Sequence, residues 1–293
     1  MIQEDKRIGG KLETRFRVIM AVFNRKELTL STIKKLYELE NQSIKIDITV
    51  CDDLSTDGTA LAIKDLYPLV QIVKTKGDYF WAKSMHLADV AAFENDYDFL
   101  VWMNDDTMLF PNAFEMVLRD YTTLQNEKSL LIGALMDPLT GLFTYTGCLD
   151  YRFKNKIELT FVGPFGIPVK IGMFSGNFVV IPRSVRALVG PIDKKFSHGW
   201  ADMEYGYRAA SKGFPSYLMS SFVGSSALNP LYNFHVDPSN SLINRIKHVY
   251  GRKGYQPIDY LRFCLKSFGF KGIKIYLHNM LQVGKDSFKA NSD

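Results

Sequence analysis

The chain has few cysteines and no long apolar segment. Its three cysteines, Cys51, Cys148 and Cys264, lie far apart and form no CxxC pair. This spacing argues against a disulfide framework or a cysteine zinc site and predicts free thiols in a reducing compartment. No apolar stretch approaches the roughly 18 residues that span a bilayer, and residues 1–15 lack the apolar core of a secretion signal. We therefore expect a cytoplasmic protein.

Glycine-rich nucleotide loops are missing as well. No G-x-G-x-x-G segment opens a predicted helix, which disfavours a nicotinamide dehydrogenase. The segment after the first apolar run, residues 23–26 (FNRK), has no glycine to hold a triphosphate, which disfavours a sugar nucleotidyltransferase. We find no internal repeat and no low-complexity segment, and 293 residues are enough for one large α/β domain or one domain plus an appendage.

Apolar segments of strand length alternate with segments of helical periodicity up to about residue 135. The predicted strands are 15–23, 44–51, 69–73 and 97–103, and the predicted helices are 27–39, 59–67, 81–93 and 111–124. This alternation predicts βαβ units and a parallel sheet. In the second half, the apolar pattern predicts strands at 130–135, 142–146, 157–161 and 177–181. It also predicts a helix at 200–211 and helical structure from residue 242 onward.

Three short acidic segments are the most informative feature present. They contain Asp52-Asp53, Asn104-Asp105-Asp106 and Asp202-Met203-Glu204. The first two follow predicted strands, and ligands of open α/β sheets bind beyond the carboxyl ends of the strands. Carboxylates gathered there repel one another unless a cation or a proton transfer uses them. The pattern predicts an enzyme that acts on a phosphorylated, metal-bridged substrate.

Each acidic segment also has a simpler interpretation. Asp52 and Asp53 offer acceptors for a base N–H or ribose hydroxyls, but an ordinary strand-to-helix turn would contain them too. Asp105 and Asp106 suit Mg²⁺ or Mn²⁺, which bind few carboxylates together with substrate phosphates. An exposed acidic turn would contain the same two residues.

Asp202 and Glu204 lie two residues apart on a predicted helix and cannot share a face. We therefore expect them to have separate roles. One carboxylate would face the cleft as a general base, and the other would pair with Arg208. A surface helix with ordinary ion pairs explains the segment equally simply.

Several single residues are weaker candidates. His235 would complete a metal site, since a neutral imidazole suits Mn²⁺, although a packed histidine is about as common. Trp81 and Trp200 would stack on a sugar ring, although a core position is the commoner one. Gly176 and Asn177 offer a close approach of the backbone to a ligand, which a plain turn also provides.

The net charge of +5 is unevenly distributed. From residue 243 onward, ten Lys and Arg face three Asp, so this region carries about +7 and the preceding part about −2. A basic region with aromatic residues suits an anionic membrane surface, and charge alone would suit nucleic acid as well. A solvated helical face or a homodimer interface would explain the same distribution of charge.

The ordered segments resemble family 2 glycosyltransferases of the GT-A fold. The resemblance is carried by residues 16–24 (FRVIMAVFN), 51–59 (CDDLSTDGT), 102–107 (WMNDDT) and 200–208 (WADMEYGYR). Residues 77–86 (GDYFWAKSMH) and 175–183 (SGNFVVIPR) resemble the bacterial rhamnosyltransferase-like branch, which builds surface polysaccharides. The match covers roughly residues 15–240.

The resemblance implies a role for each matching residue. Phe23, Asn24, Asp52, Asp53 and Asp105 would hold the nucleotide. Asp106, with His235, would bind Mg²⁺ or Mn²⁺, and Asn104 stands where the family pattern has an aspartate. Asp202 would be the catalytic base, and Ala201 departs from the family's Glu-Asp pair. The remaining candidates, which would contact the donor or acceptor sugar, are Trp81, Gly176, Asn177, Trp200 and Glu204.

We therefore expect an α/β protein of GT-A type, with an open, mostly parallel sheet sandwiched by helices and a helical C-terminal extension. The expected parts are a tail (1–14), a GT-A domain (15–240, with a nucleotide-binding half 15–135 and an acceptor half 136–240) and a basic extension (241–293). The expected activity is inverting transfer of a sugar from a dTDP- or UDP-linked donor, with rhamnose as one candidate, to a glycan or lipid-linked acceptor. A sugar nucleotidyltransferase and a non-catalytic carbohydrate- or nucleic-acid-binding protein are the competing hypotheses.

Overall fold

The computed structural model describes residues 13–151, 159–229, 234, 237, 239–251 and 254–289. The first half alternates strands and helices as the sequence predicts: β1 (Thr14–Val22), α1 (Lys26–Glu38), β2 (Ile44–Asp52), α2 (Thr59–Leu66), β3 (Gln71–Lys74), α3 (Phe80–Phe93) and β4 (Phe99–Met103). Apolar strands that pair in parallel register bury both faces. In β4 all five residues are buried, which explains its uninterrupted apolar sequence.

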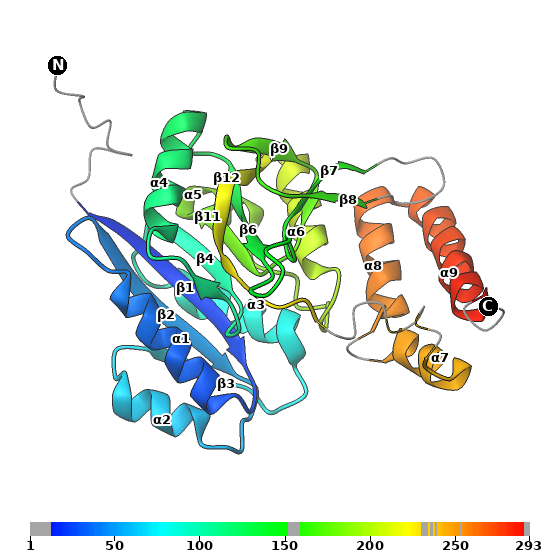
Figure 1. The fold of residues 1–293 in the computed structure, drawn as a ribbon, viewed down its shortest axis with the longest axis horizontal. Coiled ribbons are helices and arrows are strands. Elements are labelled where there is room, and N and C mark those ends of the chain that lie inside the picture. The colour runs from blue at the N-terminus through cyan, green and yellow to red at the C-terminus, as the bar shows by residue number, and fades with distance from the viewer. Residues whose placement is uncertain are drawn as a thin grey trace.

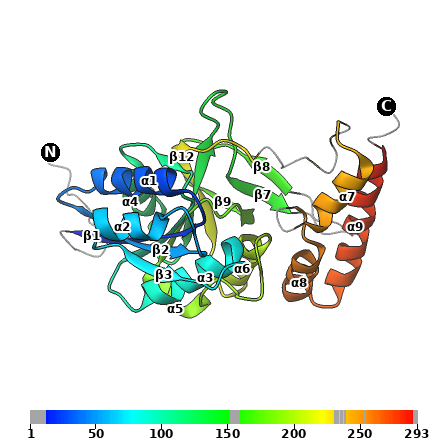
Figure 2. The same cartoon turned by 90° about the horizontal axis from the view of Figure 1, so that it is seen from below.

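The second half contains more strands and fewer helices. Its elements are β5 (Met108–Leu109), α4 (Ala113–Leu124), β6 (Leu130–Met136), β7 (Gly147–Tyr151), β8 (Leu159–Val162), β9 (Val169–Ile171), β10 (Met173–Phe174), β11 (Phe178–Pro182), α5 (Arg183–Val189), α6 (Ala201–Ser211) and β12 (Ser216–Ser225). The C-terminal extension forms α7 (Leu242–Tyr250), α8 (Pro257–Phe268) and α9 (Lys271–Lys289). Both views place these three helices together at one end of the molecule (Figures 1 and 2).

The central sheet has the strand order β3-β2-β1-β4-β11-β6-β12-β5, with β9 also pairing β12. In the described part of the chain, six of its nine strands run in the same direction, and β11, β5 and β9 run opposite to them. Strands β10, β7 and β8 form a small second sheet. The fold is therefore the expected mostly parallel α/β sheet.

Apolar side chains cover both faces of the central sheet. On one face, Phe16, Phe114 and Phe178 join a core that includes residues of α1 and α4. On the other, Trp102 and Tyr205 belong to a core that includes residues of α3, α6 and α8. Helix α8 thus shares the second core with the preceding part of the chain and packs directly on α6.

One expectation about the second half is wrong, and one strand was not predicted. Residues 142–146 form no strand beyond a single bridge between Met136 and Phe143, and the strand begins at residue 147. The ten-residue strand β12 was not expected, because serines interrupt its apolar pattern. One of them, Ser220, is buried and bonds through its backbone N–H and hydroxyl to the carboxylate of Asp120 (2.8 and 2.7 Å). A buried polar group is tolerated there because it is paired.

The described helices include none that is both long and apolar enough to cross a membrane.

Candidate active site

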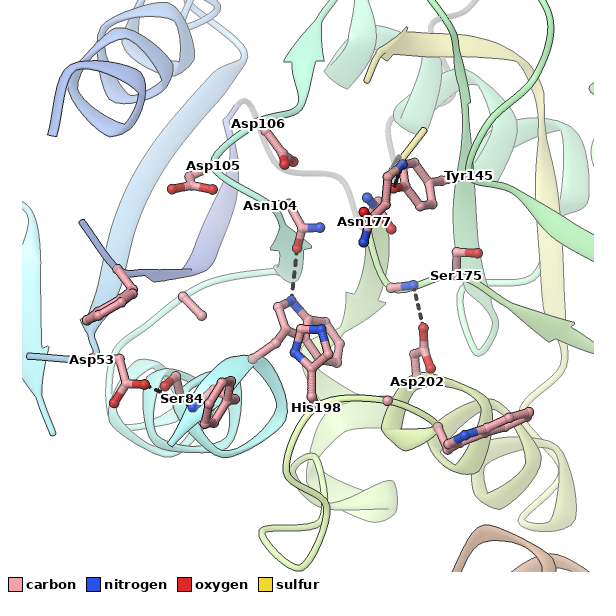
Figure 3. Close-up of a pocket in the computed structure, with 18 of the residues that line it drawn as sticks. Asp53, Ser84, Asn104, Asp105, Asp106, Tyr145, Ser175, Asn177, His198 and Asp202 are labelled. Carbon is pink, nitrogen blue, oxygen red and sulfur yellow. Dashed lines mark hydrogen bonds between the residues drawn. The ribbon is translucent and has the colours of Figure 1, made fainter. Parts of the chain in front are cut away.

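A cavity of about 1410 Å³ lies at the edge of the sheet and extends to the C-terminal extension. Asp53, Asp106 and Asp202, one residue from each acidic segment, line its wall. Figure 3 shows these side chains around the same space, together with Asn104, Asn177 and Ser175. Segments about 150 residues apart in sequence therefore meet at a single cavity.

Asp53 organises the wall beside β2. Its carboxylate accepts a hydrogen bond from the Thr75 hydroxyl (2.5 Å) and from the backbone N–H groups of Tyr79 and Phe80 (3.0 and 2.9 Å). These N–H groups lie at the N-terminus of α3, where a carboxylate is electrostatically favoured. Phe80 has a φ of 58°, so this loop adopts a left-handed conformation that Asp53 holds in place.

Of the neighbouring nucleotide-binding candidates, Phe23 lines the cavity, whereas Asp52 and Asn24 do not. Phe23 is 55% exposed. Asp52 accepts from the N–H of Ser55 (3.0 Å), and the Asn24 amide oxygen accepts from the N–H of Thr56 (2.7 Å). Both side chains hold the turn after β2, as the simpler interpretation of this segment has it.

Arg25 connects the two aspartates after β4. Its Nη1 donates to Asp105 (2.8 Å) and to Asp106 (3.2 Å). Asp105 is buried and also accepts from the Thr29 hydroxyl (3.3 Å). Burial raises the pKa of the Asp105 carboxyl, and the guanidinium of Arg25 opposes that shift. Arg25 was not expected at the site, although its position directly after the first predicted strand places a cation at the same edge of the sheet as the aspartates.

Asp106 is the best candidate for a divalent cation among the described residues. One of its oxygens, Oδ1, is buried and has no hydrogen-bond partner in the described structure, and carboxylate oxygen is the donor that Mg²⁺ and Mn²⁺ prefer. No three His, Cys, Asp or Glu side chains of the described residues are arranged to hold an ion. The residues present thus fit a cation that takes most of its ligands from phosphate and water. His235 lies outside the described residues.

Asn104 is engaged elsewhere. Its amide oxygen accepts from the indole N–H of Trp81 (2.9 Å), as Figure 3 shows. The Asn104 N–H also donates to the carbonyl of Asn177 (3.4 Å), which joins the end of β4 to the start of β11. Asn104 therefore fixes Trp81 and Asn177, both of which line the cavity.

Asp202 lies in the first turn of α6 and faces the cavity. One carboxylate oxygen accepts from the N–H of Gly176 (2.9 Å) and the other from the N–H of Met203 (2.9 Å). Burial raises the pKa of this carboxyl above its ordinary value. A methyl group on Gly176 would lie 2.7 Å from the Trp81 ring and 3.2 Å from the Asp202 Cβ. Glycine is therefore required for this close approach.

Glu204 does not line the cavity. It is 2% exposed and pairs with Arg208 (3.0 Å) and with Lys266 of α8 (2.8 Å). The predicted pair with Arg208 is confirmed, and the separate faces of Asp202 and Glu204 follow from helical spacing. The assignment of Glu204 to a sugar site does not agree with this position, because its charge is fully used in joining α6 to α8.

The extension contributes part of the cavity wall. Trp200 lines the cavity, and its indole N–H donates to the carbonyl of Tyr255 (2.8 Å). No site residue was expected in the extension, yet His248, Gly254, Tyr255 and Asn279 of the extension line the cavity. Ser84, Tyr145 and Asn229 also line it and were not expected from the sequence.

A mostly parallel α/β sheet with acidic residues beyond its strand ends is the arrangement of GT-A glycosyltransferase folds. The family profile described as "Glycosyl transferase family 2" matches residues 17–185, which is more than half of the chain. The chain belongs to glycosyltransferase family 2.

Solved structures agree with this fold. TarS 1–349 from S. aureus has a TM-score of 0.56 and 12% identity, with 94% of this chain and 81% of that chain covered. Against a longer S. aureus TarS structure the TM-score is 0.53 at 10% identity, with 88% of this chain and 44% of that chain covered. The comparison with curated proteins gave no match.

Two neighbours were solved with ligands. The mannosyltransferase PcManGT from Pyrobaculum calidifontis, in complex with GDP-Man and Mn²⁺, has a TM-score of 0.52 and 15% identity, covering 93% of this chain and 76% of that one. GalNAc-T7 with UDP, GalNAc and Mn²⁺ has a TM-score of 0.54 and 13% identity, covering 95% and 55%. At these identities the likeness concerns the fold.

Proposed function

We propose that the protein transfers a sugar from a nucleotide diphosphate donor to a hydroxyl of a glycan or lipid-linked acceptor, with inversion at the anomeric carbon. The observation that carries this proposal is the carboxylate of Asp202, half-buried and held by two backbone N–H groups on the wall of the same cavity as Asp53 and Asp106. Membership of glycosyltransferase family 2 supports it.

The donor would bind at the end of the cavity formed by the first half of the chain. Phe23 and the loop held by Asp53 would contact the base and ribose. Asp106 would hold Mg²⁺ or Mn²⁺, which when bound neutralises charge on the leaving diphosphate. Two structural neighbours crystallised with Mn²⁺ support a divalent cation. Arg25, which lines the cavity beside Asp106, adds positive charge on the protein side.

Asp202 would act as the general base. Its carboxylate would accept the proton of the acceptor hydroxyl while that oxygen attacks the anomeric carbon from the face opposite the leaving diphosphate. Burial raises the pKa of Asp202, which makes it a stronger base than an exposed aspartate. Trp81, Asn177 and Trp200 would contact the sugars, since all three line the cavity.

The donor would be a dTDP- or UDP-linked sugar, with rhamnose as one candidate. The transfer would take place in the cytoplasm, and its product would be used to build bacterial surface polysaccharide. The support for this part is the resemblance of residues 77–86 and 175–183 to the rhamnosyltransferase-like branch. In the structure these segments contain Trp81 and Gly176, which line the cavity and are close enough that a methyl group on Gly176 would lie 2.7 Å from the Trp81 ring.

We also propose reversible binding to an anionic membrane surface through α9. Arg245, part of the surface expected from the sequence, is fully buried and is not available for this. One face of α9 instead exposes the apolar side chains of Ile273, Leu277 and Leu281, with Lys271, Lys274 and Lys285 beside them. Phe270, which directly precedes α9, is 91% exposed. An exposed apolar face flanked by lysines is typical of helices that lie in a lipid interface.

Vesicle sedimentation would test the membrane proposal. We expect binding to vesicles that contain phosphatidylglycerol, weaker binding in high salt, and loss of binding in the variant Leu277→Glu/Leu281→Glu. Equal sedimentation with neutral and anionic vesicles would contradict an electrostatic contribution. If the same variant instead abolished a concentration-dependent dimer, the face would be a homodimer interface.

A screen of nucleotide sugars tests the enzymatic proposal. We expect UDP- or dTDP-sugars to raise the melting temperature more with Mn²⁺ than with EDTA. Slow release of nucleoside diphosphate without acceptor would identify a transferase. Binding without release would favour a carbohydrate-binding protein, and pyrophosphate exchange with a nucleoside triphosphate would favour a nucleotidyltransferase.

A further inference from the structure

The four residues before α6 are held by the C-terminal extension. We call Ser197, His198, Gly199 and Trp200 the α6 entry loop, because Asp202 follows it by two residues. His198, Gly199 and Trp200 all line the cavity. The position of this loop therefore determines the shape of the cavity beside Asp202.

The start of α8 bonds to two of these four residues. The Asp259 carboxylate accepts from both the N–H and the hydroxyl of Ser197 (2.8 and 2.7 Å). The Gln256 side-chain oxygen accepts from the N–H of Gly199 (2.8 Å). Asp259 and Gln256 are 3% and 7% exposed, so water cannot readily replace either bond.

Aromatic packing reinforces these bonds. The Trp200 ring stacks on Phe263 at a centroid distance of 5.5 Å and contacts Tyr260 at 4.4 Å. Trp200 has a φ of 66°, an unfavourable backbone conformation for a residue with a side chain. The contacts with α8 thus stabilise a loop conformation that the local chain would not favour.

The same loop contacts the donor side of the cavity. The Ser197 carbonyl accepts from the N–H of Ala82 in α3 (3.1 Å), next to Trp81. The entry loop therefore lies between α3, which carries Trp81, and α8, whose own neighbours His248, Tyr255 and Asn279 line the far end of the cavity.

We infer that the first turn of α8 is a positioning device for the acceptor. Gln256 and Asp259 are positioning residues, which act by fixing the entry loop so that Trp200 and His198 form the acceptor wall beside Asp202. The inference rests on the proposed function, in which the far end of the cavity receives a saccharide acceptor. The C-terminal extension would thus shape the active site, in addition to the membrane binding proposed for α9.

A matched set of full-length variants tests this inference. Gln256→Met keeps the side-chain length and removes the acceptor oxygen, Gln256→Glu restores an acceptor oxygen, and Ile258→Ala changes an exposed neighbour (73% exposed). The measurements are hydrogen–deuterium exchange of residues 196–203, UDP and dTDP affinity with MnCl₂, donor hydrolysis, and transfer to p-nitrophenyl hexosides.

We expect Gln256→Met to raise the exchange rate of residues 197–200 about tenfold, because the Gly199 N–H loses its acceptor. We expect the same variant to lower kcat/KM for a p-nitrophenyl hexoside about tenfold. Donor hydrolysis and nucleotide affinity should stay within about twofold. Gln256→Glu should recover most of the loss, and Ile258→Ala should match the wild type.

Three results would overturn the inference: unchanged exchange in Gln256→Met, an equal fall in donor affinity and transfer, or no recovery in Gln256→Glu. The exchange measurement tests whether Gln256 holds the entry loop, even if the enzyme does not use a p-nitrophenyl hexoside as acceptor. If the wild type released nucleoside diphosphate from no sugar nucleotide, the proposed function would fail separately from the contact between loop and helix.

Discussion

Replacing Asp202 by asparagine affects both roles of its carboxylate, as a base and as a hydrogen-bond acceptor. In the structure one oxygen accepts from the Gly176 N–H and the other from the Met203 N–H, each at 2.9 Å. Asparagine has a single acceptor oxygen, so in either orientation its NH₂ group faces one of these donors. The substitution therefore removes the base and one backbone hydrogen bond together.

The two losses have different magnitudes. Leaving one buried N–H without an acceptor costs about 1–3 kcal/mol of folding free energy, which corresponds to about 2–4 °C in melting temperature per kcal/mol for a chain of 150–250 residues. Losing a general base lowers kcat by about 10²–10⁴-fold. The fall in kcat at 25 °C should therefore be much larger than the fall in activity that the lower folding free energy alone would cause.

The assay compares Asp202→Asn with Glu204→Gln, its neighbour on α6. Glu204 is buried among Arg208 and Lys266 and does not line the cavity. Glu204→Gln should lower the melting temperature and leave turnover of the folded protein near wild type. Asp202→Asn should lose transfer while its UDP or dTDP affinity, measured by calorimetry with Mn²⁺, stays within about threefold.

One result would refute the reasoning: transfer by Asp202→Asn within tenfold of the wild type, with intact donor binding. Asp202 would then only hold the Gly176 N–H, and the base would have to be another group of the cavity.

The remaining predictions concern four residues. Because burial raises the pKa of Asp202 above its ordinary value of 3.8, and the base must be ionised, the acidic limb of the pH profile of turnover should lie above that ordinary value; an acidic limb at or below 3.8 would contradict this. Gly176→Ala should lower kcat about 10–100-fold, since the new methyl group would lie 3.2 Å from the Asp202 Cβ. Asp106→Ala should weaken donor binding only when Mn²⁺ is present, and equal affinities across a Mn²⁺ titration would argue against a metal at Asp106. Asp89→Ala should cost about 3–5 kcal/mol in urea unfolding, because it leaves the buried Arg186 guanidinium without its carboxylate, and a cost under about 1 kcal/mol would show that water compensates it.

Much of the fold could be predicted because local sequence and tertiary environment agree in the first half. Apolar runs such as 97–103 are buried on both faces in the sheet, so period and composition are sufficient to identify them. Strand β12 was missed for the opposite reason. Its Ser220 is compatible with a buried strand only because Asp120, one hundred residues earlier, accepts its hydrogen bonds.

The residue pattern alone predicted the candidate site as a set of segments, and the resemblance assigned individual side chains within them. Three acidic segments were expected to meet, and Asp53, Asp106 and Asp202 line one cavity. Their neighbours Asp52 and Glu204 are used in a turn and in ion pairs. Which of two nearby carboxylates faces a cavity depends on backbone direction at the end of an element, and the residue types do not specify that direction.

The sequence by itself determined the βαβ alternation, the acidic segments at the strand ends and the basic character of the C-terminal region, because each is set by residues close together in the chain. Only the tertiary structure placed Arg25 between Asp105 and Asp106, buried Arg245, and packed the first turn of α8 against the loop that precedes Asp202. These contacts join residues about 55 to 80 positions apart. They exist only after the cores on the two faces of the sheet have formed and brought those residues together.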